Sequence, residues 1–119
     1  MPEVIDLVSK FALFSDHWHP RIIAELNHSH VKLAKLHGEF IWHKHKQEDE
    51  LFWVVKGSLQ IKLRDRDLIV GEGQLVVIPK GVEHLPVAAE ETLVVLIEPV
   101  STVNTGDARS DGTREPDWL

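Results

Sequence analysis

Short apolar runs separated by turn-forming residues dominate the chain from Ile22 onward. The runs are rich in Val, Ile, Phe and Trp, and Gly, Pro, Asn or Ser interrupts them roughly every ten residues. Strands and turns at this spacing indicate an all-β sandwich or barrel, because a βαβ fold would place helical segments between the strands. The pattern predicts strands at residues 21–27, 31–36, 38–45, 50–57, 59–70, 73–79 and 92–100.

The two ends of the chain differ from this middle part. Residues 1–21 are weakly patterned and favour an N-terminal arm or a short helix. Residues 22–100 form the predicted barrel. Residues 101–119 are polar except for Trp118, which predicts an irregular tail that lies along the barrel or crosses to a neighbouring subunit.

Composition narrows the class of protein further. The chain has 119 residues, enough for one domain, with 43% hydrophobic and 27% charged residues. Its net charge of −6 and the lack of a basic run argue against nucleic acid as a partner. The absence of cysteine excludes disulfides and zinc–thiolate sites. No apolar run approaches the ~20 residues of a membrane span, and no signal peptide is evident, so we expect a cytoplasmic protein with no membrane partner.

Histidine is enriched, with eight residues in 119. Three His-x-His pairs occur, namely His17/His19, His28/His30 and His43/His45. Residues two apart in a strand point to the same face, so each pair could offer two imidazoles to one metal. An isolated pair is more often solvent-exposed, and we interpret the first two pairs that way. The third differs, because Glu50 opens the next predicted strand and His84 follows the turn at residues 79–81.

These residues resemble the two signature motifs of the cupin superfamily. The first motif falls on Gly38, His43, His45, Glu50 and Gly57, and the second on Gly73, Pro79, Gly81 and His84. Two departures occur: the interval after Gly38 is one residue short, and Ala88 stands where the family has Asn, which is not a metal ligand. The resemblance implies a jelly-roll (double-stranded β-helix) barrel, a metal held by His43, His45, Glu50 and His84, and a homodimer.

The donor set agrees with this implication. Three neutral imidazoles and one carboxylate suit one divalent transition metal (Fe, Mn, Ni, Co or Zn). Four protein ligands to an octahedral ion leave two positions open, as in catalytic sites. The sequence therefore predicts a metal-dependent enzyme acting on a small oxygen-rich metabolite, by isomerase, lyase or iron-dependent oxygenase chemistry. The alternative is a non-catalytic small-molecule binding or sensing module, since the cupin fold by itself fixes no substrate.

Strand alternation gives three further expectations. Glu39 and Ile41 should face inward with the histidines. Phe40, Trp42 and Trp53 should form an outward aromatic cluster, a candidate subunit interface. One of two lysines in the second predicted strand, Lys32 or Lys35, should point into the barrel.

Overall fold

The computed structural model describes residues 2–108 and 112–119. Its elements are α1 (Leu7–Phe11), β1 (Arg21–Leu26), β2 (Ser29–Glu39), β3 (Glu50–Lys56), β4 (Ser58–Lys62), β5 (Asp67–Gly71), β6 (Leu75–Ile78), β7 (Leu85–Pro99) and β8 (Asp117–Trp118). The regular secondary structure is therefore almost all β-strand, as predicted. No helix in the described part is long and apolar enough to cross a membrane. The cytoplasmic location stays a prediction.

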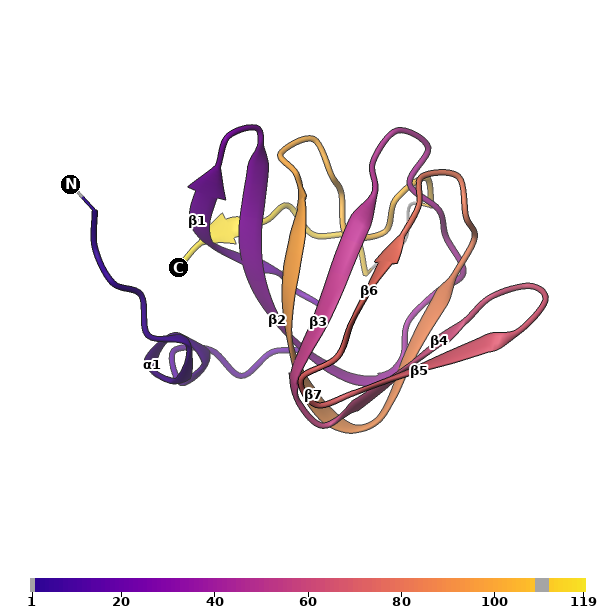
Figure 1. Ribbon diagram of the computed structural model, residues 1–119, viewed down its shortest axis with the longest axis horizontal. Coiled ribbons are helices and arrows are strands. Elements are labelled where there is room, and N and C mark those ends of the chain that lie inside the picture. The colour runs from indigo at the N-terminus through magenta and orange to yellow at the C-terminus, as the bar shows by residue number, and fades with distance from the viewer. Residues whose placement is uncertain (1, 109–111) are drawn as a thin grey trace.

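The strands form a jelly-roll sheet organised around the long strand β7. The hydrogen-bonded order is β5-β4-β7-β2-β1-β8, and β3 pairs with both β7 and β6. The first part of β7 pairs with β4, whereas its second part pairs with β3. The strand bends sharply between these parts, so the β4–β5 hairpin lies across the lower end of the other strands (Figure 1). The sheet curls into a barrel without closing, which confirms the predicted cupin architecture.

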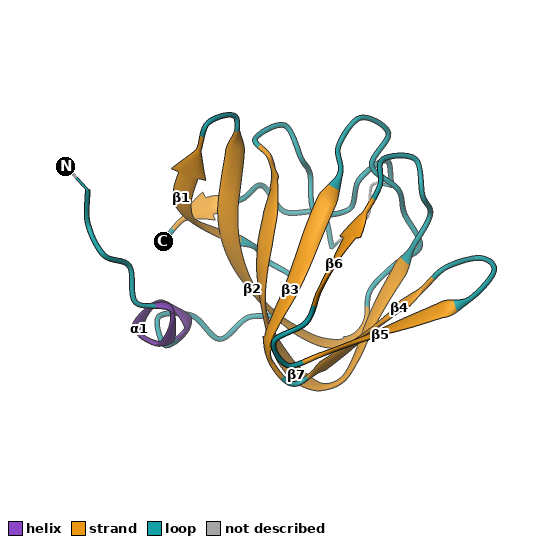
Figure 2. Ribbon diagram, in the orientation of Figure 1, coloured by secondary structure: helices purple, strands orange, loops and turns teal. Residues whose placement is uncertain are grey.

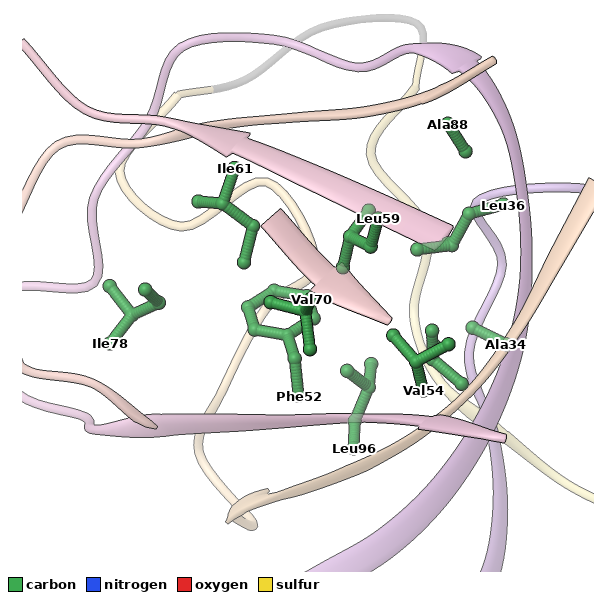
Figure 3. Packing of buried hydrophobic residues seen from close by; sticks show 11 residues of the cluster. Ala34, Leu36, Phe52, Val54, Leu59, Ile61, Val70, Ile78, Ala88 and Leu96 are labelled. Carbon is green, nitrogen blue, oxygen red and sulfur yellow. The ribbon is translucent and has the colours of Figure 1, made fainter. Parts of the chain in front are cut away.

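Alternation along β2 and β7 separates an inner from an outer face. Ala34 and Leu36 of β2 are buried inside the barrel with Val94 and Leu96 of β7. Phe52 packs against this set from β3 and, as Figure 3 shows, points into the same interior. Burial of these side chains supplies the main stabilising free energy, at about 25 cal/mol for each Å² of apolar surface.

The N-terminal arm covers part of the outer face. Asp6 caps the N-terminus of helix α1, because its carboxylate accepts a hydrogen bond from the backbone N–H of Ser9 at 2.9 Å. Phe11 then packs on Leu33 and Val95, which alternate with the inward residues of β2 and β7. The helix lies outside the barrel in Figure 2. The arm is therefore an ordered part of the fold, with the short helix that the sequence favoured.

Three predicted strands differ from the structure. Residues 59–70 form the β4–β5 hairpin instead of one strand, because the charged residues 64–66 form an exposed turn. The last predicted strand, 92–100, begins earlier, at Leu85, since β7 bends without breaking. The segment 38–45 leaves the sheet at Glu39 and continues as an extended loop. Within this loop only His43 forms a β-bridge, and its partner is His84.

This loop overturns the predicted facing of its side chains. Glu39 is exposed, whereas Phe40 lines the same cavity as His43, the reverse of the expected alternation. Trp42 also leaves the proposed aromatic cluster, because its ring lies 3.7 Å from the guanidinium carbon of Arg64. The physical reason is that the alternation of β2 continues through Glu39, which still pairs with Val87, and is lost only in the loop between Phe40 and His43. The homodimer stays a prediction, which sedimentation velocity would test.

The C-terminal tail lies along its own barrel. Strand β8 pairs in parallel with β1, and the Trp118 ring packs edge-on against His30 at 5.9 Å. Earlier in the tail, the N–H of Asp107 donates to the carbonyl of Lys44 at 2.9 Å. This second contact fixes the tail beside the loop that carries His43 and His45.

Candidate metal centre

Four potential ligands converge at one end of the barrel interior. Their donor atoms all lie within 4.8 Å of one another, and the four residues are buried. The residues are His43, His45, Glu50 and His84. No other group of three or more His, Asp or Glu residues in the described part of the chain converges in this way. The structure thus contains a cluster, formed by the residues predicted from the sequence, that could hold a metal ion.

Each ligand is positioned by a different local structure. Glu50 is the first residue of β3, where it pairs with Ile78. The backbones of His43 and His84 pair directly, with N···O distances of 3.1 and 2.8 Å. The carbonyl of His45 accepts a hydrogen bond from the N–H of Gly81 at 2.8 Å. The cluster therefore depends on backbone pairing between the loop after β2 and the turn before β7.

Two of the imidazoles have a defined tautomer. The ring Nδ1 of His43 lies 2.9 Å from the carbonyl oxygen of Ile41, and that of His84 lies 3.0 Å from the carbonyl oxygen of Val82. A carbonyl oxygen can only accept, so Nδ1 carries the proton in both rings. Each Nε2 is then left with a free lone pair, the state in which histidine binds a metal.

The donor atoms are buried without adequate hydrogen-bond partners. Nε2 of His84, both ring nitrogens of His45 and Oε1 of Glu50 have none. Oε1 of Glu50 lies 3.3 Å from Nε2 of His45 and 3.4 Å from Nε2 of His84. Unsatisfied buried polar atoms are costly, so a cluster of them calls for a specific explanation. A cation bonded by bonds of about 2.1 Å would satisfy Nε2 of His84, Oε1 of Glu50 and one of the two nitrogens of His45 together.

The electrostatics of the histidines favour a mixed protonation state. Burial, reinforced by His84, lowers the pKa of His43 to about 4. Burial also acts to lower the pKa of His45, but the carboxylate of Glu50, 3.3 Å from its Nε2, outweighs burial and raises that pKa. A metal must therefore compete with a proton at His45 more than at His43.

A second buried carboxyl lies beside the cluster. Burial and the charge of Glu50 raise the pKa of Glu98 well above its ordinary value, although Lys32 acts in the opposite direction. Burial acts to raise the pKa of Glu50 as well, but contacts from Glu98, His45 and His84 hold it well below its ordinary value. Both carboxyl groups line the same cavity, so each influences the pKa of the other. Of the two buried carboxyl groups, Glu50 therefore keeps a negative charge more readily than Glu98.

A partly open cavity of about 30 Å³ reaches the cluster, with room for roughly two water molecules. Apolar side chains form most of its wall. Its polar members are His43, Glu50, Glu98 and Asn104. Trp18 and Asn104 come from the N-terminal arm and the C-terminal tail, so both ends of the chain help to close the cavity.

Sequence reasoning missed several of these residues. Glu98 gave a usable signal, because it is a lone acid in an apolar run and shares the parity of Val94 and Leu96. Trp18 and Asn104 gave none, since only the folding of arm and tail over the barrel places them here. Of the two lysines, Lys32 points inward to Glu98. Lys35 instead donates to the carbonyl of Phe14.

The remaining His-x-His pairs lie away from the cluster. His17 pairs with Glu91 at 2.7 Å, and His19 with Asp16 at 3.1 Å. The side chain of His30 is only 12% exposed and pairs with Glu25, whereas His28 is exposed. None of these four histidines belongs to the cluster of His43, His45, Glu50 and His84. The prediction that they are solvent-exposed is wrong for His19 and His30, because the tail covers both.

Comparison with known proteins agrees with the fold. The family model described as a cupin domain matches residues 29–100, so the chain belongs to the cupin family. A cupin-2 domain containing protein from Shewanella frigidimarina has a crystal structure that is 51% identical, with a TM-score of 0.80, covering 81% of this chain and 94% of that one. Protein NMB1881 from Neisseria meningitidis is 32% identical, with a TM-score of 0.75, covering 82% and 99%. The Bacillus subtilis (strain 168) protein YdbB is 35% identical over 77 residues, 64% of this chain and 68% of YdbB.

Proposed function

We propose that this cupin binds one divalent transition metal through His43, His45, Glu50 and His84 and acts as a metal-dependent enzyme on a small oxygen-rich metabolite. One observation carries the proposal: four buried ligand atoms converge within 4.8 Å, and most of them lack a hydrogen-bond partner. A purely structural polar cluster would be expected to satisfy its own atoms.

The chemistry of the donor atoms narrows the choice of metal ion. Imidazole nitrogen with one carboxylate oxygen suits Fe(II), Mn(II), Co(II), Ni(II) or Zn(II) better than Ca²⁺ or Mg²⁺, which prefer oxygen. The single charge of Glu50 offsets half of the charge on a divalent ion. When bound, such an ion supplies Lewis acidity toward oxygen atoms of a neighbouring molecule.

The protein's own residues would prepare the site for this chemistry. The carbonyls of Ile41 and Val82 hold the rings of His43 and His84 with Nε2 free, so little reorganisation is needed on binding. Phe40 stacks on Trp18 at 4.7 Å between ring centroids and meets His43 edge-on. This aromatic wall limits access of water to the cavity and strengthens electrostatic interactions inside it.

The proposal is tested by the metal content of untagged protein purified without chelators. We expect about one equivalent of metal per chain, with loss of the metal in His84→Ala. His37→Ala is the matched control, because His37 is an exposed histidine outside the cluster. A wild-type protein that takes up none of the five metals, or a His84→Ala variant that retains one, would refute the site.

A non-catalytic binding module is the second candidate, and the small volume of the cavity favours it. The two are separated by incubating the metal-loaded protein with small hydroxy acids, hydroxy ketones and diketones, with and without oxygen, under proton NMR. If the wild type converts one of these compounds and His84→Ala does not, the protein is an enzyme. Line broadening without conversion supports the binding module.

A further inference from the structure

A lysine and a glutamate form a fully buried pair inside the barrel. Nζ of Lys32 lies 2.8 Å from Oε1 of Glu98, and both side chains are only 1% exposed. Their neighbours on the same faces of β2 and β7 are apolar, including Ala34 and Leu96. Burying such a pair costs several kcal/mol for each ion before their attraction is counted, and an apolar pair of similar size is often at least as stable. Stability alone therefore does not explain the pair.

Glu98 has hydrogen-bonding capacity that the rest of the protein leaves unused. Lys32 engages Oε1, whereas Oε2 is buried and has no hydrogen-bond partner. Whether or not the carboxyl group carries a proton, Oε2 retains a position for one more hydrogen bond. Glu98 itself is 2% exposed and lines the cavity that also contains Glu50 and His43.

The other polar lining residues are already engaged. Nδ2 of Asn104 donates to the carbonyls of Trp18 and Gly112, and its Oδ1 accepts from the N–H of Arg114. His43 and Glu50 belong to the candidate metal centre. Among the described residues that line this cavity, Glu98 is thus the polar group left for a molecule beside the cluster.

We propose that Glu98, oriented by Lys32, is a ligand-binding residue that hydrogen bonds to a hydroxyl group of the small molecule held at the metal centre. The ligand class that fits is a hydroxy acid or hydroxy ketone, in which a carbonyl or carboxylate oxygen stands next to a hydroxyl group. The carbonyl or carboxylate faces His43 and Glu50, and the hydroxyl faces Oε2 of Glu98. The apolar remainder of the wall favours a compound with few other polar groups.

This inference rests on the proposed metal site, and its test separates the two. Cobalt(II)-loaded protein is titrated with glycolate and with methoxyacetate, and the visible spectrum of the cobalt reports binding. The two probes offer the same oxygen atoms, but only glycolate has a hydroxyl donor. The test variant is Lys32→Met with Glu98→Leu, which replaces the buried pair by apolar residues of similar size. Lys35→Met is the matched control, since Lys35 lies on the same strand and contacts Phe14 instead.

We expect the preference of wild type for glycolate over methoxyacetate to fall about tenfold in the double variant, the usual effect of one hydrogen bond to a buried carboxylate. Cobalt content should stay unchanged, and Lys35→Met should behave as wild type. Glu98→Gln is the second variant if the double variant does not fold. Its amide can donate to the ether oxygen of methoxyacetate, so the preference should fall here too.

Three outcomes contradict the inference in different ways. An unchanged preference with full cobalt content shows that Glu98 does not contact the ligand, while the metal site stands. Loss of cobalt with an unchanged preference in the loaded fraction shows that Glu98 acts by positioning Glu50. A wild-type protein that binds no cobalt refutes the metal site, and this inference with it.

Discussion

The backbones of His43 and His84 pair as an isolated antiparallel bridge, and each N–H donates to the carbonyl of the other residue. The two histidines come from different signature motifs, and no regular strand contains either of them. This bridge joins the loop after β2 to the turn before β7 and brings the ring centroids within 4.3 Å. The positions of two proposed ligands therefore depend on these two backbone hydrogen bonds. We expect the geometry of the cluster to respond to a bound metal ion.

Metal should stabilise the fold through this cluster. A ligand at 100 times its Kd raises the free energy of unfolding by about 2.7 kcal/mol. For a chain of this size we expect a rise in Tm of about 10 °C on adding Co(II) or Zn(II) to chelator-treated protein. Differential scanning calorimetry measures it. His84→Ala should show no rise, and an equal rise in that variant would place the binding elsewhere.

The stability of the metal-free protein should fall in mild acid because of His43. The pKa of His43 is about 4 in the folded protein and 6.5 when unperturbed, so between these values the unfolded chain binds more protons. The contribution of His43 is complete above pH 6.5 and is lost as the pH falls toward 4. Over that window it amounts to about 3 kcal/mol. His45 acts in the opposite direction, because its pKa is raised in the fold.

Urea unfolding of chelator-treated protein at pH 4.5 and pH 7 isolates the effect of His43. His43→Gln should lose less stability between the two pH values than wild type does. His28→Gln is the control, because His28 is exposed and should leave the pH dependence unchanged. The same pH dependence in His43→Gln and wild type would contradict the assignment.

The buried Lys32–Glu98 pair predicts a non-additive pair of substitutions. Glu98→Leu alone leaves the Lys32 ammonium buried and unpaired, at a cost of about 3–5 kcal/mol. Adding Lys32→Met should recover most of this loss, because no buried charge then remains. Urea denaturation of the wild type, the two single variants and the double variant gives the coupling free energy. If the loss of unfolding free energy in the double variant equals the sum of the losses in the two single variants, the two side chains do not interact.

Alanine substitutions at Gly57 and Gly73 separate the cost of a steric contact from the cost of backbone strain. Both have positive φ, +99° at Gly57 and +76° at Gly73. A Cβ at Gly57 would lie 2.7 Å from Oγ1 of Thr92, whereas a Cβ at Gly73 would have no neighbour within 4 Å. Gly73→Ala should therefore cost only about 1–2 kcal/mol of backbone strain. Gly57→Ala should cost more, because Thr92 must also move.

Chemical denaturation of both alanine variants measures this difference. Gly57→Ala combined with Thr92→Ser retains the hydroxyl group and is not expected to relieve the contact. Equal losses for the two glycines would show that the backbone near Thr92 adapts without cost.

The sequence by itself determined the all-β class and the four candidate metal ligands. Short apolar runs with regular turns specify an all-β chain, since strand formation depends mainly on local alternation and turn residues. The identity and spacing of His43, His45, Glu50 and His84 were readable because each lies next to a recognisable turn or strand start. Packing was not needed to name them.

Only the tertiary structure decided which further groups face the site. The alternation counted back from His43 did not apply to Phe40, because the loop between them has no period of two and Phe40 keeps the inward facing of Ala34 and Leu36 in β2. Trp18 and Asn104 reach the cavity only because the arm and the tail fold back onto the barrel. The Lys32–Glu98 pair joins residues far apart in the chain, on neighbouring strands β2 and β7. Long-range pairing of this kind is set by the register of the assembled sheet, which no local pattern encodes.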